Sequence, residues 1–119
     1  MNRLVLSDAA PLVCLAQVDG LSCLKTLFGQ VHITQHVLEE ILTGKGKPGE
    51  DNLKQAVERL LLRVHPEWDW PTPQFPALGK GEASCISAAV NLRDQGHDCL
   101  LLIDDREARR AASSIHNSG

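Results

Sequence analysis

The sequence predicts an α/β fold, in which a parallel sheet carries helices on both of its faces. Short apolar segments alternate with helix-like segments along the whole chain, a pattern typical of parallel strands joined by right-handed crossovers. The segment at 99–103 is an unbroken apolar run, which is typical of a strand covered on both faces. With 119 residues, the chain is expected to form a single domain over residues 1–119.

The first part of the chain predicts two strands and three helices, whose ends are marked by individual residues. Pro11 is tolerated in the first turn of a helix, and Gly20 separates that helix from the next one. Thr34 is a suitable N-cap for the third helix. The expected elements are a strand at 3–6, helices at 9–18 and 21–28, a strand at 30–33 and a helix at 35–42.

The second part of the chain continues the alternation of strands and helices. Four prolines between residues 66 and 78 predict an irregular surface connection. Gly96 ends a helix that carries apolar residues at helical spacing, and a new helix is expected directly after the apolar run at 99–103. The expected elements are a helix at 50–60, a strand at 61–65, a helix at 81–95, a strand at 99–103 and a last helix from 106.

Composition excludes some classes of protein. A net charge of −3 argues against binding nucleic acid through bulk positive charge, but it allows a nuclease whose acids hold a cation. No apolar run is long enough to span a bilayer, so no membrane contact and a cytoplasmic location are expected. The four cysteines form no C-x-x-C pair, which favours reduced, buried thiols over a disulfide framework or a zinc site.

Carboxylates follow two of the predicted strands. Asp8 comes after the first strand, and Asp104 and Asp105 come after the last one. The carboxyl ends of parallel strands share one edge of the sheet, and the helix that begins near Glu82 has its amino end toward the same edge. Converging acids repel unless a cation compensates them, and oxygen ligands suit Mg²⁺ or Mn²⁺. Such ions favour phosphodiester hydrolysis.

Each acid, taken alone, also has an ordinary structural explanation. An acid directly before a helix caps it, and an acid in the first turn faces the positive end of the helix dipole. Glu39 and Glu40 both flank the apolar stripe of their helix, and periodicity does not choose between them. His32 and His36 are four residues apart, but a strand-to-helix junction separates them, so chance explains this spacing better than a metal pair.

Several short motifs, taken in order, resemble the PIN-domain nucleases, and most closely a branch similar to the toxins of toxin–antitoxin pairs. The motifs are Val-Leu-Ser-Asp at 5–8, Val-Leu-Glu-Glu-Ile at 37–41, Gly-Glu-Ala at 81–83 and Leu-Leu-Ile-Asp-Asp-Arg at 101–106. The resemblance implies a three-layer α/β/α sandwich with a central parallel sheet. It also implies a Mg²⁺- or Mn²⁺-dependent endoribonuclease that hydrolyses RNA through a metal-activated water, with a cognate antitoxin and a homodimer as plausible partners.

The resemblance also implies roles for individual acids. Asp8, Glu40, Glu82 and Asp105 match the four catalytic acids of the family, with Asp104 as a second candidate for the last position. Asp8 and Asp105 would be the main metal ligands, and Glu82 would complete the metal site, to which Asp104 is a further candidate ligand. Glu40 would bind or orient a metal-bound water.

Two basic residues lie beside the last acids. Arg106 and Arg109 are candidates for binding RNA phosphate, although a solvated helix face explains them about as well.

Two features depart from the family pattern. Ala9 stands where the family often has a hydroxyl residue, and the chain ends at Gly119 without the C-terminal strand that the family normally adds. The second feature suggests a shortened or truncated domain with an open sheet edge. Together they favour an alternative function, in which a catalytically inactive PIN-like domain acts by partner binding or dimerisation.

Overall fold

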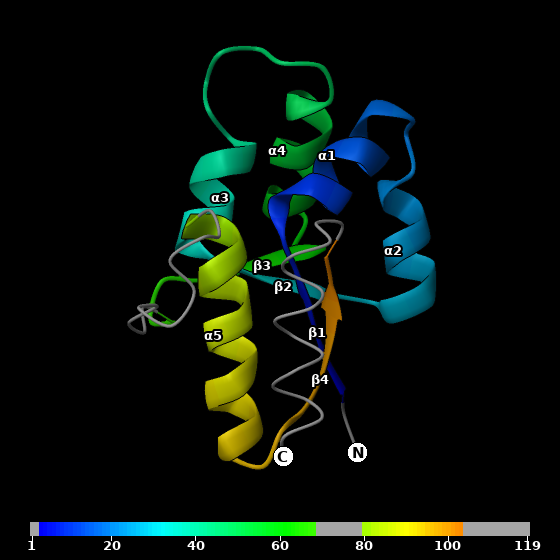
Figure 1. The fold of residues 1–119 in the computed structure, drawn as a ribbon. Coiled ribbons are helices and arrows are strands. Elements are labelled where there is room, and N and C mark those ends of the chain that lie inside the picture. Colours follow the sequence, from blue (N-terminus) through cyan, green and yellow to red (C-terminus); the bar gives the residue numbers. More distant parts are fainter. Residues whose placement is uncertain (1–2, 69–79, 104–119) are drawn as a thin grey trace.

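The computed structural model describes residues 3–68 and 80–103 (Figure 1). Every strand and helix predicted within these residues is present, and no boundary moves by more than two residues. The helix expected from residue 106 lies outside the described residues. The elements are β1 (Arg3–Ser7), α1 (Ala9–Gln17), α2 (Leu21–Phe28), β2 (Val31–Thr34), α3 (Gln35–Ile41), α4 (Glu50–Glu58), β3 (Leu62–His65), α5 (Lys80–Asp94) and β4 (Asp98–Leu102).

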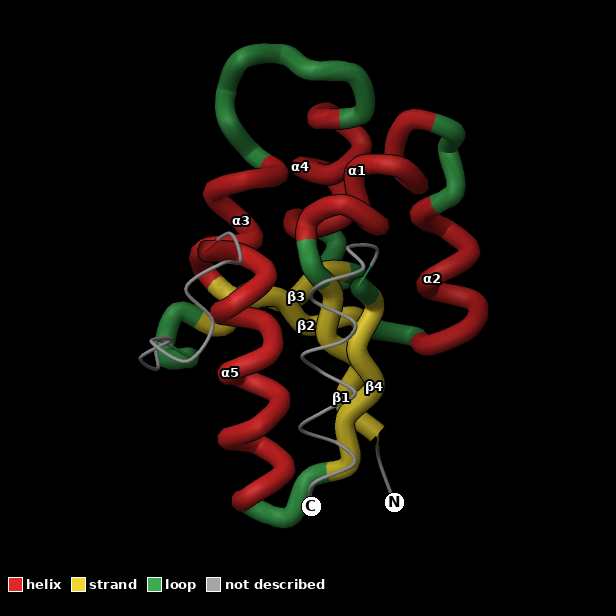
Figure 2. The backbone as a smooth tube through the Cα atoms, viewed as in Figure 1, coloured by secondary structure: helices red, strands yellow, loops and turns green. Residues whose placement is uncertain are grey.

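The four described strands form one parallel sheet in the order β3-β2-β1-β4. β1 is flanked by β2 on one side and by β4 on the other, and Ser7 at the end of β1 is paired with Leu102 at the end of β4. Helices cover both faces of this sheet (Figures 1 and 2). The predicted three-layer α/β/α architecture is therefore confirmed.

The two faces of the sheet bury two separate apolar cores, because alternate strand residues point in opposite directions. Val5 of β1 enters the larger core, which joins β1, β2 and β3 to helices α1 to α4. Leu6, the next residue, enters the smaller core beneath α5. In β4, Leu100 and Leu102 pack against the larger core, whereas Cys99 and Leu101 pack against the smaller one.

The apolar run at the fourth strand is less buried than the sequence predicts. β4 lies at the end of the described strand order, and its residues from Cys99 to Leu102 are only partly buried. An end position gives a strand one neighbour instead of two, which explains the difference.

The cysteine prediction is half right. All four cysteines are free, and Cys85, a residue of α5, is buried in the smaller core. Cys14 and Cys23 are exposed, which contradicts the expectation of buried thiols. Their apolar sequence neighbours do not share their position, because α1 and α2 each turn only one face toward the core.

Within residues 3–68 and 80–103, no single helix is long and apolar enough to cross a membrane. α1 and α2 together reach such a length and composition, but they meet at a bend of 118°. Their residues Leu12 and Leu24 are buried in the larger core.

Candidate functional site

The strand order changes direction between β1 and β4. The chain moves from β1 to β2 and β3 on one side of the sheet, and then returns to place β4 on the other side of β1. The backbone N–H of Asp8 donates to the carbonyl oxygen of Leu102 over 3.0 Å, so the carboxyl ends of the two strands are joined directly. In open parallel sheets, ligands bind outside the carboxyl ends of the strands at such a point.

Asp8 lies at this point, and its side chain is buried with 1% of its surface exposed. Its Oδ1 atom accepts a hydrogen bond of 2.7 Å from the backbone N–H of Ala9. Asp8 therefore caps α1, as expected of an acid directly before a helix. The amino end of a helix is favourable for a negative charge. A carboxylate in so little contact with water is stable only when charges or hydrogen bonds compensate its burial, and the Ala9 N–H supplies one such bond.

The amino end of α5 is attached to the same edge of the sheet. The hydroxyl groups of Thr34, at the end of β2, and Ser84, in α5, are joined by a buried hydrogen bond of 2.6 Å. The pKa of the Cys85 thiol is raised by burial and, to a smaller extent, by the charge of Asp8. α5 also contacts β1, the strand that Asp8 follows. Glu82 belongs to α5 one turn or less before these residues, and its side chain is outside the described part of the structure.

α3 begins at this edge, where the Thr34 hydroxyl accepts a hydrogen bond of 3.2 Å from the N–H of Val37 and so caps the helix as predicted. The helix contacts both α1 and α5. Glu39 and Glu40 lie at its far end, and both are exposed. Burial therefore does not decide which of the two glutamates is the site acid, a question that periodicity also left open.

Four of the predicted site residues lie outside the described residues: Asp104, Asp105, Arg106 and Arg109. The structure does describe the residues directly before them: Leu102 is paired with Ser7, and Ile103 is buried. Asp104 is the next residue in the chain after Ile103.

The chemical type of the ligand atoms at this edge suits a hard divalent cation. The buried group is a carboxylate, and oxygen ligands of this type are those that Mg²⁺ and Mn²⁺ prefer. Among the side chains that the structure describes, no group of three His, Cys, Asp or Glu residues converges well enough to hold a metal ion. A complete ligand set would therefore need acids whose side chains are not described, among them Glu82 and Asp104.

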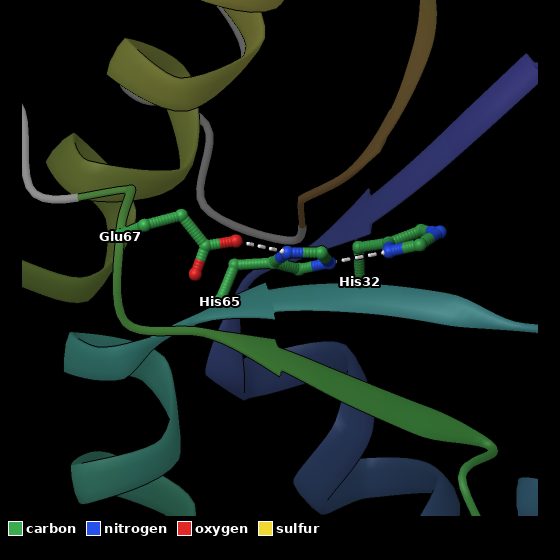
Figure 3. A network of polar contacts seen from close by, with 3 residues as sticks. All are labelled: His32, His65 and Glu67. Carbon is green, nitrogen blue, oxygen red and sulfur yellow. Dashed lines mark hydrogen bonds and ion pairs between the residues drawn. The ribbon is translucent and has the colours of Figure 1, made fainter.

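A second polar cluster, which the sequence did not indicate, lies on β2 and β3 (Figure 3). His32 Nδ1 and His65 Nε2 are 2.7 Å apart, and His65 Nδ1 is 2.7 Å from Glu67 Oε1. Burial, followed by the charges of His65 and Arg63, lowers the pKa of His32 from 6.5 to about 4. The sequence gives no signal for this contact, because the two histidines are 33 residues apart and meet only through strand pairing.

A family model described as a PIN domain matches residues 4–116 of the chain. No curated protein and no solved structure matches.

Proposed function

Because the chain belongs to the PIN-domain family, whose members are generally nucleases, we propose that it is a metal-dependent endoribonuclease of the toxin type. The observation that carries the proposal is the position of Asp8. Its buried carboxylate lies where the order of the strands reverses, which is the place where an α/β sheet of this kind binds its ligand. The reaction would be hydrolysis of RNA phosphodiesters.

In this proposal the acids have different roles. A bound Mg²⁺ or Mn²⁺ would activate water and stabilise charge on the phosphoryl group. Asp8 and Asp105 would hold the ion, with Asp104 as a further ligand and Glu82 completing the set. Glu40 would orient the water.

The surroundings of the acids would bind the substrate. Arg106 and Arg109 would contact RNA phosphates. The capping bond between Asp8 and the N–H of Ala9 would hold the carboxylate in one orientation while the ion binds.

Two protein partners belong to the same proposal: a cognate antitoxin and a second copy of the chain. We further propose a cytoplasmic location, where the RNA substrate would be met. Sedimentation of the purified chain over a range of concentrations would test the homodimer.

The decisive experiment compares Asp8→Asn with a control variant, Asp94→Asn. Asn is as good an N-cap as Asp, so the first variant should fold while losing its charge. Asp94 is exposed and lies at the other end of α5, near the amino edge of the sheet, so it carries the same substitution away from the site. Mn²⁺ binding is measured by calorimetry, and RNA cleavage is measured on the same samples.

We expect Asp8→Asn to lose both Mn²⁺ binding and cleavage, and Asp94→Asn to keep both. Cleavage by Asp8→Asn at the wild-type rate would contradict the proposed site. Absence of Mn²⁺ binding by the wild-type chain would instead favour a catalytically inactive domain that acts by partner binding or dimerisation. Ala9, which brings no hydroxyl to the site, and the structural role of Asp8 as a cap are the observations on that side.

A further inference from the structure

The histidine cluster lies on β2 and β3, on the face of the sheet opposite to the larger core. Val31 and Ile33 of β2 enter the larger core, so His32 between them projects from the opposite face of the sheet. His65 is the last residue of β3 and reaches the same face, where its Nε2 atom meets His32 Nδ1. Neither imidazole has a part in the proposed nuclease mechanism.

The hydrogen bonds determine which nitrogen atoms carry protons. An ionised carboxylate only accepts, so His65 donates from Nδ1 to Glu67. In the neutral form of His65, Nε2 then carries a lone pair, which accepts the Nδ1–H of His32. The pKa of His32 is lowered, chiefly by burial, so this ring is neutral near pH 7. The pKa of Glu67 is lowered too, first by a backbone hydrogen bond and then by its bond to His65.

The His65 ring is held in place before any ligand arrives. Trp68 stacks on His65 with the ring centres 3.7 Å apart and the planes inclined by 8°. The backbones of the two strands are paired in register, with Thr34 opposite His65 and Arg63 opposite His32. The two nitrogen atoms that face each other are therefore positioned by paired strands rather than by a loop.

We propose that His32 Nδ1 and His65 Nε2 bind a zinc-class metal ion, with Glu67 as the carboxylate behind His65 and water completing the coordination. A histidine ligand whose other nitrogen donates to a carboxylate is the usual arrangement around protein-bound zinc, because the carboxylate fixes the ring and makes it more basic. Imidazole nitrogen prefers Zn²⁺, Cu²⁺ or Ni²⁺ over Mg²⁺. The site would thus select a different ion from the carboxylate edge.

The required movement is small. Tetrahedral zinc with bonds of about 2.0–2.1 Å needs its two nitrogen ligands about 3.3 Å apart. The present separation of 2.7 Å must therefore widen by about 0.6 Å. The proton on His32 Nδ1 moves to His32 Nε2 by exchange with water, so a neutral ring stays neutral and binding changes its tautomer.

The charges around the pair bear on affinity in opposite directions. Arg63 lies opposite His32 on the neighbouring strand and is exposed, so it opposes a cation only through solvent. Glu67 lies on the other side of His65 and favours a cation. With two protein ligands, affinity should depend strongly on how well Glu67 orients His65.

The test follows the imidazole nitrogens directly. The full chain, labelled with ¹⁵N-histidine, is titrated with Zn²⁺ and separately with Mg²⁺, and the ring nitrogen signals are recorded by NMR. We expect His32 to change from the Nδ1–H to the Nε2–H tautomer with Zn²⁺ but not with Mg²⁺. His65 Nε2 should move to the chemical shift of a metal-bound nitrogen at the same time.

Variants away from the coordinating atoms complete the test. Glu67→Gln, at an exposed position, should weaken Zn²⁺ binding at these nitrogens by about tenfold or more. His97→Asn, which removes an exposed histidine elsewhere, should leave it unchanged. Asp8→Asn should also leave the tautomer change intact, so the result is independent of the nuclease proposal. Retention of the Nδ1–H tautomer by His32 at saturating Zn²⁺, or equal binding by wild type and Glu67→Gln, would overturn the proposal.

Discussion

Gly49, the N-cap of α4, lies close to α1, and replacing it by alanine should destabilise the protein through two separate effects. The residue has a φ of +85°, in the left-handed region that favours glycine. An added Cβ would lie 2.9 Å from the Cβ atom of Ala16, 3.0 Å from its carbonyl carbon and 3.1 Å from the backbone nitrogen of Gln17. Backbone atoms of a helix cannot move aside as a flexible side chain can.

The magnitude follows from adding the two effects. A left-handed conformation costs an alanine about 1–2 kcal/mol. Overpacking against fixed neighbours typically costs about 1–3 kcal/mol more. Gly44→Ala is the matched control, because Gly44 has a φ of +76° and no atom within 4 Å of an added Cβ. It should therefore lose only about 1–2 kcal/mol.

Urea unfolding of the wild type and both variants measures these losses. Gly49→Ala should have a clearly lower transition midpoint than Gly44→Ala, with the slope of the unfolding free energy unchanged. The gain from reducing the entropy of the unfolded chain is the same in both variants, so it cancels in the comparison. Equal losses would mean that the close approach of α4 to α1 contributes nothing, and the packing argument would be wrong.

Two further effects concern titratable groups. The pKa of His32 falls from 6.5 to about 4 on folding, so the unfolded chain binds that proton more tightly, and stability should decrease as pH falls through this interval. Because the ring is only partly buried, we expect a loss of about 1 kcal/mol, absent in His32→Gln, from urea unfolding at each pH. The Glu50 carboxylate accepts hydrogen bonds from the backbone N–H groups of Thr43, Gly44 and Gly46. Glu50→Gln should therefore speed exchange of these three amides, whereas Asp51→Asn should not; equal exchange rates would refute this role.

The fold was predictable because its signals are local. Each strand is a short apolar run, and Gly20, Gly29 and Gly96 mark breaks that side-chain periodicity alone would blur. Thr34 and Asp8 cap the helices that they were expected to cap. The depth of burial was less predictable, since it depends on where a strand lies in the sheet. The apolar run of β4 does not reveal that it lies at the end of the described order.

The Asp8 site and the histidine cluster also differ in how well the sequence predicts them. Asp8 is recognisable because a strand end and a helix start meet at one residue, and parallel pairing then gives its neighbours. The contact between His32 and His65 depends on the register of two strands, which the sequence pattern does not determine. A residue in such a pair looks like an ordinary strand residue until its partner is known.

The pairing of β1 with β4 has a consequence for how the protein folds. Arg3 and Asp98 are partners in the sheet although 95 residues separate them, and their side chains form an ion pair of 3.0 Å. Contacts of such long range slow folding, because the intervening chain must be ordered or looped before they form. β1, β2 and β3 can associate earlier, but the edge beside Asp8 is completed only when β4 docks. We therefore expect folding to end with the step that assembles the candidate nuclease site.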